Sequence, residues 1–483
     1  MITVIEAQEF IRQKTAPLAA ETVPLAQAQG RVLAEPVAAS EDMPPFDRSA
    51  MDGYAVRMDD NAHEFAVVGE IRAGQVIEAQ LKPGQAMRIF TGAQLPGPGL
   101  KVILQEHVEA QDGRIRVQQP SHGSNVRQRG EDAKAGEILL EPAITLDATA
   151  LALLASVGQT SVRVVSQPKI LHLTTGDEIV PPEQTPAPGQ IRNSNASLIA
   201  GLCREQGIEV VTHYHAPDDL PALLKIFSDA KAGTYDMILI SGGSGQGTYD
   251  FSGELFQHLG AEIHFRAVNV RPGKPLIFGT VARREGVEPR SQTPFGNAIV
   301  GAIQLPHDVP PQGSAMELPQ QGCSQMEFRN KEGRSSSPPE TPMGVSVSQD
   351  DGLAKEGATR RPQIIFGLPG NALSHFVCFH LFVRLALDRL LARPGATATH
   401  VFLANDLTGA LNTRETWWPA QARLKKGRLE CRALPWKSSG DITRLPAANA
   451  LLHVPSSTSH LPAGTMVELL LTRNLEITHD ILS

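Results

Sequence analysis

Three apolar runs in the chain each end in a turn rich in glycine or acidic residues. The runs span residues 168–173, 235–240 and 364–366, and each is typical of a buried strand. The turns that follow read TTGDE at 174–178, SGGSGQG at 241–247 and GLPGN at 367–371. Parallel strands of a doubly wound sheet bring such turns to one carboxyl edge, where ligands bind at the point of strand reversal. Because backbone N–H groups at such turns attract anions, the pattern predicts a site for a phosphorylated or oxyanionic ligand.

The hydrophobic pattern changes several times along the chain and predicts a multidomain protein of the α/β plus β class. Short β-like runs punctuated by Gly and Pro indicate a compact β domain, inserted between the halves of a helical spacer. A helix is expected over 145–158, with Gly158 just past its end. The predicted domains are a spacer (1–45 and 141–163), an inserted β domain (46–140), a doubly wound α/β domain (164–281 and 362–393) and a C-terminal small β-barrel (394–483).

Residues 282–361 interrupt the α/β region and lack either periodicity. They are rich in Pro, Ser, Gln and Gly, as in the run SSSPPETP at 335–342. A structureless segment of about 80 residues far exceeds ordinary loop lengths. The composition predicts a disordered insertion, within which limited proteolysis should cut first.

Composition excludes several classes of protein. The chain of 483 residues has a net charge of −7 and a pI of about 6.1, which leaves no basic footprint for nucleic acid. Its first residues resemble no signal peptide, and the most apolar stretch, 376–391, carries four polar or charged side chains, so a membrane span is not expected. That stretch is predicted to be an amphipathic core helix. Four widely spaced cysteines favour neither a disulfide framework nor a zinc site, and we expect a cytoplasmic location.

Carboxylates follow two of the three apolar runs. Asp177 and Glu178 lie at the end of the first strand, and Asp250 follows the second Gly-rich loop, so all three could face a Mg²⁺ ion that also binds phosphate oxygens. For Asp177 the alternative role is that of a helix N-cap. His213 and His215 would lie on the same side of a strand, but no third ligand is evident and no metal site is predicted there.

Six motifs, in order, resemble a known family. They read PFDRSAMDGYAVR at 45–57, RIFTGA at 88–93, RGED at 129–132, TGDE at 175–178, RPGKP at 271–275 and GLPGN at 367–371. Together they resemble the MoeA-type molybdopterin molybdenumtransferases, whose eukaryotic relatives include the E domain of gephyrin. The resemblance covers nearly the whole chain apart from the insertion.

The resemblance implies an enzyme of molybdenum cofactor biosynthesis. Such an enzyme takes adenylylated molybdopterin and molybdate, cleaves the phosphoanhydride with Mg²⁺, and leaves molybdenum cofactor and AMP. It also implies a homodimer, in which Asp52 of one subunit completes the pocket of the other, and allows a molybdopterin adenylyltransferase as a partner. Two rival interpretations remain: an adenylyltransferase, which would lack the N-terminal signature, and a non-catalytic relative that binds pterin or acts as a scaffold.

The resemblance also assigns roles to individual residues. The catalytic group consists of Asp52, Thr91, Asp132, Glu178, Asp218 and Asp250. Residues matched to molybdate or molybdopterin binding are Gly176, Asp177, Ser241, Gly242, Gly243, Arg266, Arg271, Lys274, Pro369, Gly370, Asn371 and Ser374. Mg²⁺ would be held by Asp177, Glu178 and Asp250.

Alternatives remain open at several of these positions. Asp52 could simply fix its own turn, Asn371 or Ser374 could cap a helix, and Asp219 competes with Asp218 for the assigned role. The chain also departs from the family, because Arg266 and Arg271 stand where lysine is usual. Arginine offers a planar fork in place of a point charge. The second Gly-rich loop and Ala372, in place of proline, differ as well.

Overall fold

The computed structural model describes most of the chain outside the insertion. The described residues are 1–120, 123–209, 211–230, 232–242, 251–283, 361–408, 413–425, 427–473 and 475. Within these ranges no helix has both the length and the apolar character needed to cross a membrane. Three of the cysteines, Cys203, Cys378 and Cys431, are buried free thiols, as expected, and Cys323 lies outside the described residues.

A six-stranded sheet forms the centre of the α/β domain. Its strand order is β16 (Val211–Ala216), β13 (Ile170–Thr175), β17 (Met237–Ser241), β21 (Gln363–Leu368), β20 (Ile277–Val281) and β18 (Ala261–Phe265). The first four strands are parallel, and β20 and β18 extend the sheet with antiparallel pairing. In chain order, β13 is the first strand of this sheet. The next strand, β16, lies on one side of it and β17 lies on the other, so the strand order reverses between β13 and β17.

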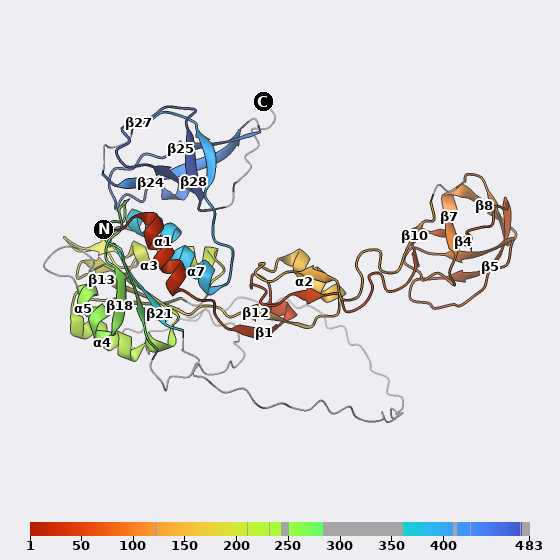
Figure 1. The fold of residues 1–483 in the computed structure, drawn as a ribbon, viewed down its shortest axis with the longest axis horizontal. Helices are drawn as coiled ribbons and strands as arrows, with labels where there is room; N and C mark the ends of the chain where they lie inside the picture. Colours follow the sequence, from red (N-terminus) through yellow and green to blue (C-terminus); the bar gives the residue numbers. More distant parts are fainter. Residues whose placement is uncertain are drawn as a thin grey trace, which may run out of the picture. The chain divides into compact units, whose positions relative to one another are not determined.

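Alternating side chains on these strands bury both faces of the sheet. Leu239 and Phe366 point into a core shared with α3 (Ser194–Glu205). Ile238 and Ile365 point into a second core, under α4 (Leu220–Asp229) and α5 (Phe251–His258). Figure 1 shows α1, α3 and α7 on one face of the sheet and α4 and α5 on the other. Two covered faces explain the continuous apolar runs and confirm the predicted doubly wound sheet.

The long apolar stretch after the third turn is a helix interrupted by one π-helical turn. It consists of α6 (Ala372–Cys378), the π-turn Phe379–Val383 and α7 (Arg384–Leu390). It is a core helix, as predicted, but the expectation that it is amphipathic was wrong, because almost every side chain in it is buried. Its surroundings explain this: the same core contains residues of α1, of the sheet and of the C-terminal domain, including Trp417, Leu451 and Leu470.

Helix α1 (Val4–Lys14) begins with a capping box between Thr3 and Glu6. Its apolar side chains Val4, Ala7 and Ile11 are buried in the α/β core, although the sequence analysis placed residues 1–45 in the spacer. The segment 20–24 that follows is β1 (Ala20–Pro24), which pairs with β12 (Ser161–Val165). The helix therefore belongs energetically to the α/β domain.

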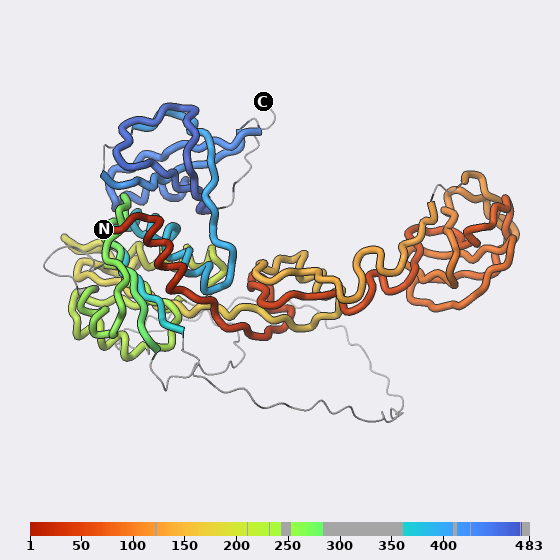
Figure 2. Tube along the Cα trace, in the orientation of Figure 1, coloured from red at the N-terminus to blue at the C-terminus, as the bar shows by residue number. Residues whose placement is uncertain are grey.

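The spacer combines two strand pairs with one helix. Besides β1 and β12, β2 (Val37–Ala38) pairs with β11 (Ile138–Leu140). The outgoing and returning chain segments run side by side through this region (Figure 2). Helix α2 (Ala148–Ser156) is capped by Asp147 and covers a small core of its own.

The inserted domain, predicted as a compact β domain, is built on a six-stranded sheet. Its order is β7 (Leu100–Leu104), β4 (Gly53–Arg57), β6 (Gln85–Ile89), β5 (Glu64–Ile71), β9 (Arg114–Val117) and β8 (Val108–Gln111). Two short strands, β3 (Arg48–Ser49) and β10 (Val126–Arg127), pair nearby. Side chains on the two faces of the sheet form separate cores.

The C-terminal domain is a closed five-stranded barrel, as predicted. Its order is β24 (Glu415–Lys425), β25 (Arg428–Ala433), β22 (Thr399–Leu403), β28 (Met466–Leu471) and β26 (Ala450–Val454), and β26 pairs back onto β24. The short strand β19 (Val270–Arg271) adds to β24 and joins the barrel to the α/β domain. Minor pairs are β14 (Ile179–Val180) with β15 (Ile191–Arg192), and β23 (Leu407–Thr408) with β27 (His460–Leu461).

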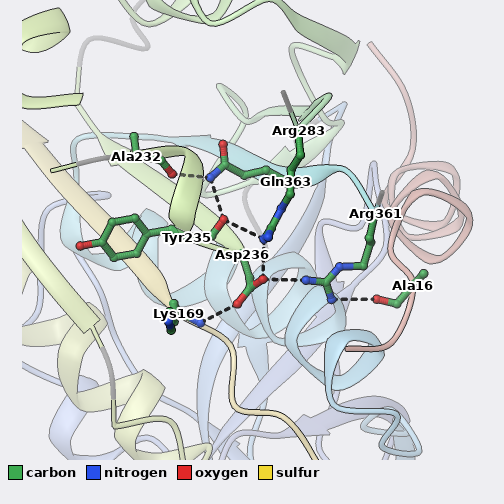
Figure 3. Close-up of polar contacts among 8 residues, drawn as sticks. All are labelled: Ala16, Lys169, Ala232, Tyr235, Asp236, Arg283, Arg361 and Gln363. Atoms are coloured by element: carbon green, nitrogen blue, oxygen red, sulfur yellow. Dashed lines mark hydrogen bonds and ion pairs between the residues drawn. The ribbon is translucent and has the colours of Figure 1, made fainter. Parts of the chain in front are cut away.

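The predicted insertion joins two neighbouring antiparallel strands. Residues 284–360, on which the prediction of disorder falls, lie outside the described residues. On either side of them Val281 of β20 pairs with Gln363 of β21. Just beyond this pair, Arg283 and Arg361 each place a guanidinium nitrogen 2.6 Å from the same oxygen of Asp236 (Figure 3). Both ends of the insertion are thus held at the amino end of β21.

Candidate functional site

The three turns singled out in the sequence lie together at the carboxyl edge of the central sheet. In the register of the strands, Thr174 of β13 is level with Ser241 of β17, and Ser241 is level with Leu368 of β21. On the other side of β13, Thr175 is level with Ala216 of β16. The strands therefore end side by side around the point where the strand order reverses, which is where open α/β sheets bind ligands.

Close backbone approach at this edge requires glycine. Gly242 has a φ of +107°, and a Cβ on it would lie 2.7 Å from the carbonyl oxygen of Thr175 and 2.8 Å from its hydroxyl. On the other side, a Cβ on Gly370 would lie 4.0 Å from the Cα of Gly242. The first, second and third turns are therefore in contact through Gly242, and any larger residue there would push them apart.

Acidic residues gather at the end of β13 and β16. A carboxylate oxygen of Asp177 accepts a hydrogen bond of 3.1 Å from the backbone N–H of Asp218. Asp219, in contrast, caps α4 by accepting from the N–H of Ala222 at 2.9 Å. Of the two neighbouring aspartates, Asp218 is therefore the one beside the first turn, and Asp219 is the one that caps a helix. The Oδ1 atom of Asp218 is buried without a hydrogen-bond partner, and Glu178 is exposed.

The basic turn at 271–274 packs against α6. A Cβ on Gly273 would lie 2.6 Å from the Sγ atom of Cys378 and 3.8 Å from the carbonyl oxygen of Ser374. Glycine therefore lets the turn that carries Arg271 and Lys274 lie directly against the helix that follows the third turn. Ser374 itself is buried on α6. Arg266 lies just after β18 and is exposed.

A loop of the C-terminal barrel reaches the third turn. Asn371 donates from its side-chain amide to the hydroxyl of Ser439 at 2.8 Å, and it makes no capping bond to α6. The carbonyl oxygen of Ser439 accepts from the N–H of Leu373 at 3.1 Å. The guanidinium of Arg271 lies 5.3 Å from the ring centre of Trp436. No site residue in the barrel was predicted from the sequence, because no motif there fixes the register.

Pro369 and Gly370 complete the third turn. Pro369 is buried, and the carbonyl oxygen of Gly370 accepts from the side-chain amide of Asn195, near the start of α3, at 2.7 Å. On the neighbouring strand β17, the hydroxyl of Ser241 is buried between His172 and His375. Asn195 and these two histidines were not identified as site residues from the sequence.

Three of the predicted catalytic residues lie in the inserted β domain. Asp52 accepts two hydrogen bonds from Thr91, one from its N–H and one from its hydroxyl. These two bonds, the backbone one first, lower the pKa of the Asp52 carboxyl below its usual value. Asp132 forms an ion pair with Arg127. Thr91 and Asp52 are therefore one unit.

Two predicted site residues, Gly243 and Asp250, lie outside the described residues. Among the residues that are described, no group of three or more His, Cys, Asp or Glu side chains is arranged to hold a metal ion. The described acidic corner therefore offers the carboxylates of Asp177 and Asp218 together with the exposed carboxylate of Glu178.

Comparisons with known proteins agree with the domain pattern. A family model described as "MoeA N-terminal region (domain I and II)" matches residues 2–158, "Probable molybdopterin binding domain" matches 172–303, and "MoeA C-terminal region (domain IV)" matches 402–472. The three matches follow the same order as the spacer with its inserted domain, the α/β domain and the barrel.

Similar proteins and a similar solved structure carry consistent names. A molybdopterin molybdenumtransferase of Nostoc is 40% identical over 54% of this chain and 61% of its own length. A molybdopterin molybdenumtransferase of Staphylococcus aureus is 32% identical over 59% of this chain and 69% of its own. The crystal structure of a molybdopterin biosynthesis MoeA protein from Pyrococcus horikoshii aligns with a TM-score of 0.70 at 25% identity, covering 98% of this chain and 100% of that one. The chain belongs to the MoeA family of molybdopterin molybdenumtransferases.

Proposed function

We propose that the protein is a transferase of molybdenum cofactor biosynthesis, which inserts molybdenum from molybdate into adenylylated molybdopterin and releases AMP. The observation that carries the proposal is the edge of the central sheet, where glycine turns, an acidic corner and a basic turn lie around the point of strand reversal. Family membership and the names of the relatives support the same substrates.

The glycine turns and the basic turn suit the two anions of the reaction. Molybdate is a tetrahedral dianion, and the pyrophosphate bridge of the adenylylated pterin is also anionic. Arg271 and Lys274 supply positive charge from a turn packed on α6, next to the buried Ser374. Trp436 lies against the guanidinium of Arg271 and restricts its orientation. We assign molybdate to this side and the phosphates to the turn at Gly242.

The acidic corner fits Mg²⁺ in its chemistry. Mg²⁺ is usually bound by one or two carboxylates, with waters and substrate phosphates completing its shell. Asp177 and Asp218 provide two carboxylates on adjoining strand ends, linked by the hydrogen bond from the Asp218 N–H to the Asp177 carboxylate, and the buried, unpartnered oxygen of Asp218 is the kind of atom that a cation satisfies. Bound there, Mg²⁺ would neutralise charge on the phosphates. Glu178 and Asp250 are further candidate ligands from the first and second turns.

In this proposal the protein contributes position and charge. Gly242 lets the phosphates approach the backbone, Asp177 and Asp218 place the metal, and Arg271 with Lys274 hold the oxyanion close to the dithiolene. Glu178 is exposed at the same corner and would accept a proton from an attacking water. Asn371, fixed by Ser439, closes the side of the site that faces the barrel.

The proposal includes a homodimer in the cytoplasm. Asp52 and Thr91 form an ordered acidic unit on a separate domain, and we propose that this unit, together with Asp132, acts on the α/β edge of a second subunit. A cytoplasmic location agrees with the buried free thiols. A molybdopterin adenylyltransferase would be the natural supplier of the substrate, because its product is the adenylylated pterin.

One assay tests the activity. Purified protein is incubated with adenylylated molybdopterin, MgCl₂ and molybdate, and AMP release is followed together with transfer of the product to an apo-molybdoenzyme. AMP release that requires both Mg²⁺ and molybdate supports the proposal. Tight binding of the adenylylated pterin without any hydrolysis would instead identify a non-catalytic binding protein, and ATP-dependent adenylylation of molybdopterin would identify an adenylyltransferase.

A further inference from the structure

A continuous line of hydrogen-bonded side chains runs beneath the turns of the candidate site. It links the edge strand β16, the strands β13 and β17, and helix α6. The contacts are His215 Nδ1 to Thr174 Oγ1 at 3.1 Å, Thr174 Oγ1 to His213 Nε2 at 3.4 Å, His213 Nδ1 to His172 Nδ1 at 3.3 Å, His172 Nε2 to Ser241 Oγ at 2.7 Å, and Ser241 Oγ to His375 Nε2 at 2.6 Å. None of the four histidines has a role in the proposed reaction.

The end of the line at α6 determines where the protons lie. His375 Nδ1 is 3.3 Å from the carbonyl oxygen of Asn371, which can only accept a hydrogen bond. His375 is fully buried, and burial lowers its pKa to about 4, so the ring is neutral at pH 7. Its single proton is therefore on Nδ1. The bare Nε2 then accepts the hydroxyl proton of Ser241.

The positions of the other protons in the line follow from the proton on His375. Since Ser241 has donated its only proton, His172 must donate to it from Nε2, which leaves His172 Nδ1 bare. His213 donates to that atom from its own Nδ1, so its Nε2 accepts from Thr174. The hydroxyl of Thr174 in turn accepts from Nδ1 of His215 and, at 2.9 Å, from the side-chain amide of Asn193.

Every hydrogen bond in the line points in the same direction, and no donor faces another donor. Asn193 is the N-cap of α3, and Asn371 is the N-cap residue of α6. The line thus ties the starts of two helices to the ends of three parallel strands. The only proton of Ser241 is directed to His375, so its hydroxyl offers no hydrogen to a ligand.

We propose that His172 and His375 are positioning residues, which hold Ser241, and with it the Gly242 turn, in one orientation against the Asn371 turn. The inference rests on the proposed function, because it assigns these residues a part in shaping that same site. They touch no substrate. Their effect passes through the backbone that follows Ser241, where a shift of about 1 Å can cost a hundredfold in rate.

Paired substitutions separate hydrogen bonding from packing. His375→Gln keeps an acceptor near the position of Nε2, and His172→Gln keeps a donor there, whereas leucine at either position keeps only the apolar volume. The matched control is His380→Leu, because His380 is also buried on the same helical segment but has no hydrogen-bond partner among the described side chains and backbone. We expect His375→Leu and His172→Leu to lower kcat for AMP release about 10- to 100-fold, with the glutamine variants within about threefold of wild type and His380→Leu unchanged.

A direct readout concerns the wild-type protein alone. In ¹⁵N-histidine-labelled protein at pH 7.5, His375, His213 and His215 should show the Nδ1–H tautomer and His172 the Nε2–H tautomer, with assignments from the single variants. In the Ser241→Ala background, substitution of His375 should no longer shift the ring ¹⁵N signals of His172. An Nε2–H tautomer at His375, or leucine variants that remain folded with wild-type kcat, would overturn the inference. Wild-type protein that releases no AMP would refute the proposed function and leave the tautomer pattern as a separate result.

Discussion

Thr91 donates two hydrogen bonds of 2.7 Å to a single carboxylate oxygen of Asp52, one from its backbone N–H and one from its hydroxyl. Both bonds favour the charged carboxylate and lower the pKa of Asp52. We therefore expect Asp52→Asn to reduce AMP release at least about 100-fold without loss of thermal stability. Thr91→Val, which keeps the backbone bond, should cost about tenfold or less.

Asp59→Asn is the control for that experiment. Asp59 is an exposed carboxylate of the same domain and is ion-paired with Arg57 rather than with Thr91. Its substitution should leave AMP release unchanged. Equal losses in Asp52→Asn and Asp59→Asn would show that the domain responds to charge in general and would remove Asp52 from the proposed site.

Complementation between inactive variants tests the shared active site. A dimer of Asp52→Ala and Asp218→Ala subunits would contain one site with both carboxylates intact and one site with neither. After unfolding and refolding a 1:1 mixture, we expect about a quarter of wild-type AMP release, because half the dimers are mixed. Activity no higher than that of the separate variants would contradict an active site shared across the dimer.

Substitution of Gly242 tests the close packing of the turns. Gly242→Ala places a Cβ within 2.7 Å of the Thr175 carbonyl oxygen at a φ of +107°. We expect a loss of about 1–3 kcal/mol in the free energy of unfolding and much weaker binding of the adenylylated pterin, measured by calorimetry. Gly201→Ala is the control, since Gly201 lies within α3 with open space around it and should gain stability slightly. Unchanged pterin affinity in Gly242→Ala would contradict the assignment of the turn.

Buried neutral histidines predict acid sensitivity. Burial lowers the pKa of His172 well below its ordinary value, that of His375 to about 4 and that of His380 to about 3. The unfolded chain takes up protons on these rings near pH 6.5, whereas the folded chain does not, so stability is full above that pH and falls as the pH drops toward 4. Each ring contributes a slope of about 1.4 kcal/mol per pH unit in this window.

Urea unfolding at pH 7, 6 and 5 measures that slope. His380→Leu should raise the free energy of unfolding at pH 7 by about 1–3 kcal/mol, because it removes an unpartnered buried polar ring, and should flatten the pH dependence. A slope between pH 5 and 7 that is the same in wild type and His380→Leu would show that this ring is not neutral in the folded protein.

The contacts at the two ends of the insertion indicate that the insertion can be removed without loss of the fold. Because Val281 and Gln363 are paired and Arg283 and Arg361 share Asp236, a short Gly-Ser linker in place of residues 284–360 should keep Tm within a few degrees and retain AMP release. Asp236→Ala, in contrast, should cost about 3 kcal/mol, since it leaves two arginines unpaired. If the deletion variant failed to fold while Asp236→Ala folded normally, the prediction would be wrong, and the fold would depend on the insertion and not on the ion pairs of Asp236.

The strand-to-turn junctions were predictable because buried parallel strands leave continuous apolar runs bounded by glycine. Other features could not be predicted, because they depend on contacts between distant parts of the chain. Strand β24 tolerates Pro419 because the proline lies where β24 pairs with β26 but not yet with β25, so its missing N–H breaks no bond to β25. His213 and His215 were correctly expected on one side of a strand. Their partners His172 and His375 were not found, because the register of neighbouring strands cannot be read from sequence.

Strand β21 lies between β17 and β20, although about 80 residues of insertion separate it from β20 in the chain. During translation β17 and β20 are therefore made well before the strand that must join them. At about 5 to 20 residues per second, the insertion delays β21 by about 4 to 16 seconds, in which two apolar strand edges have no partner. The length of the insertion thus sets how long the edges of β17 and β20 stay unpaired in each nascent chain before its ligand-binding edge can be completed.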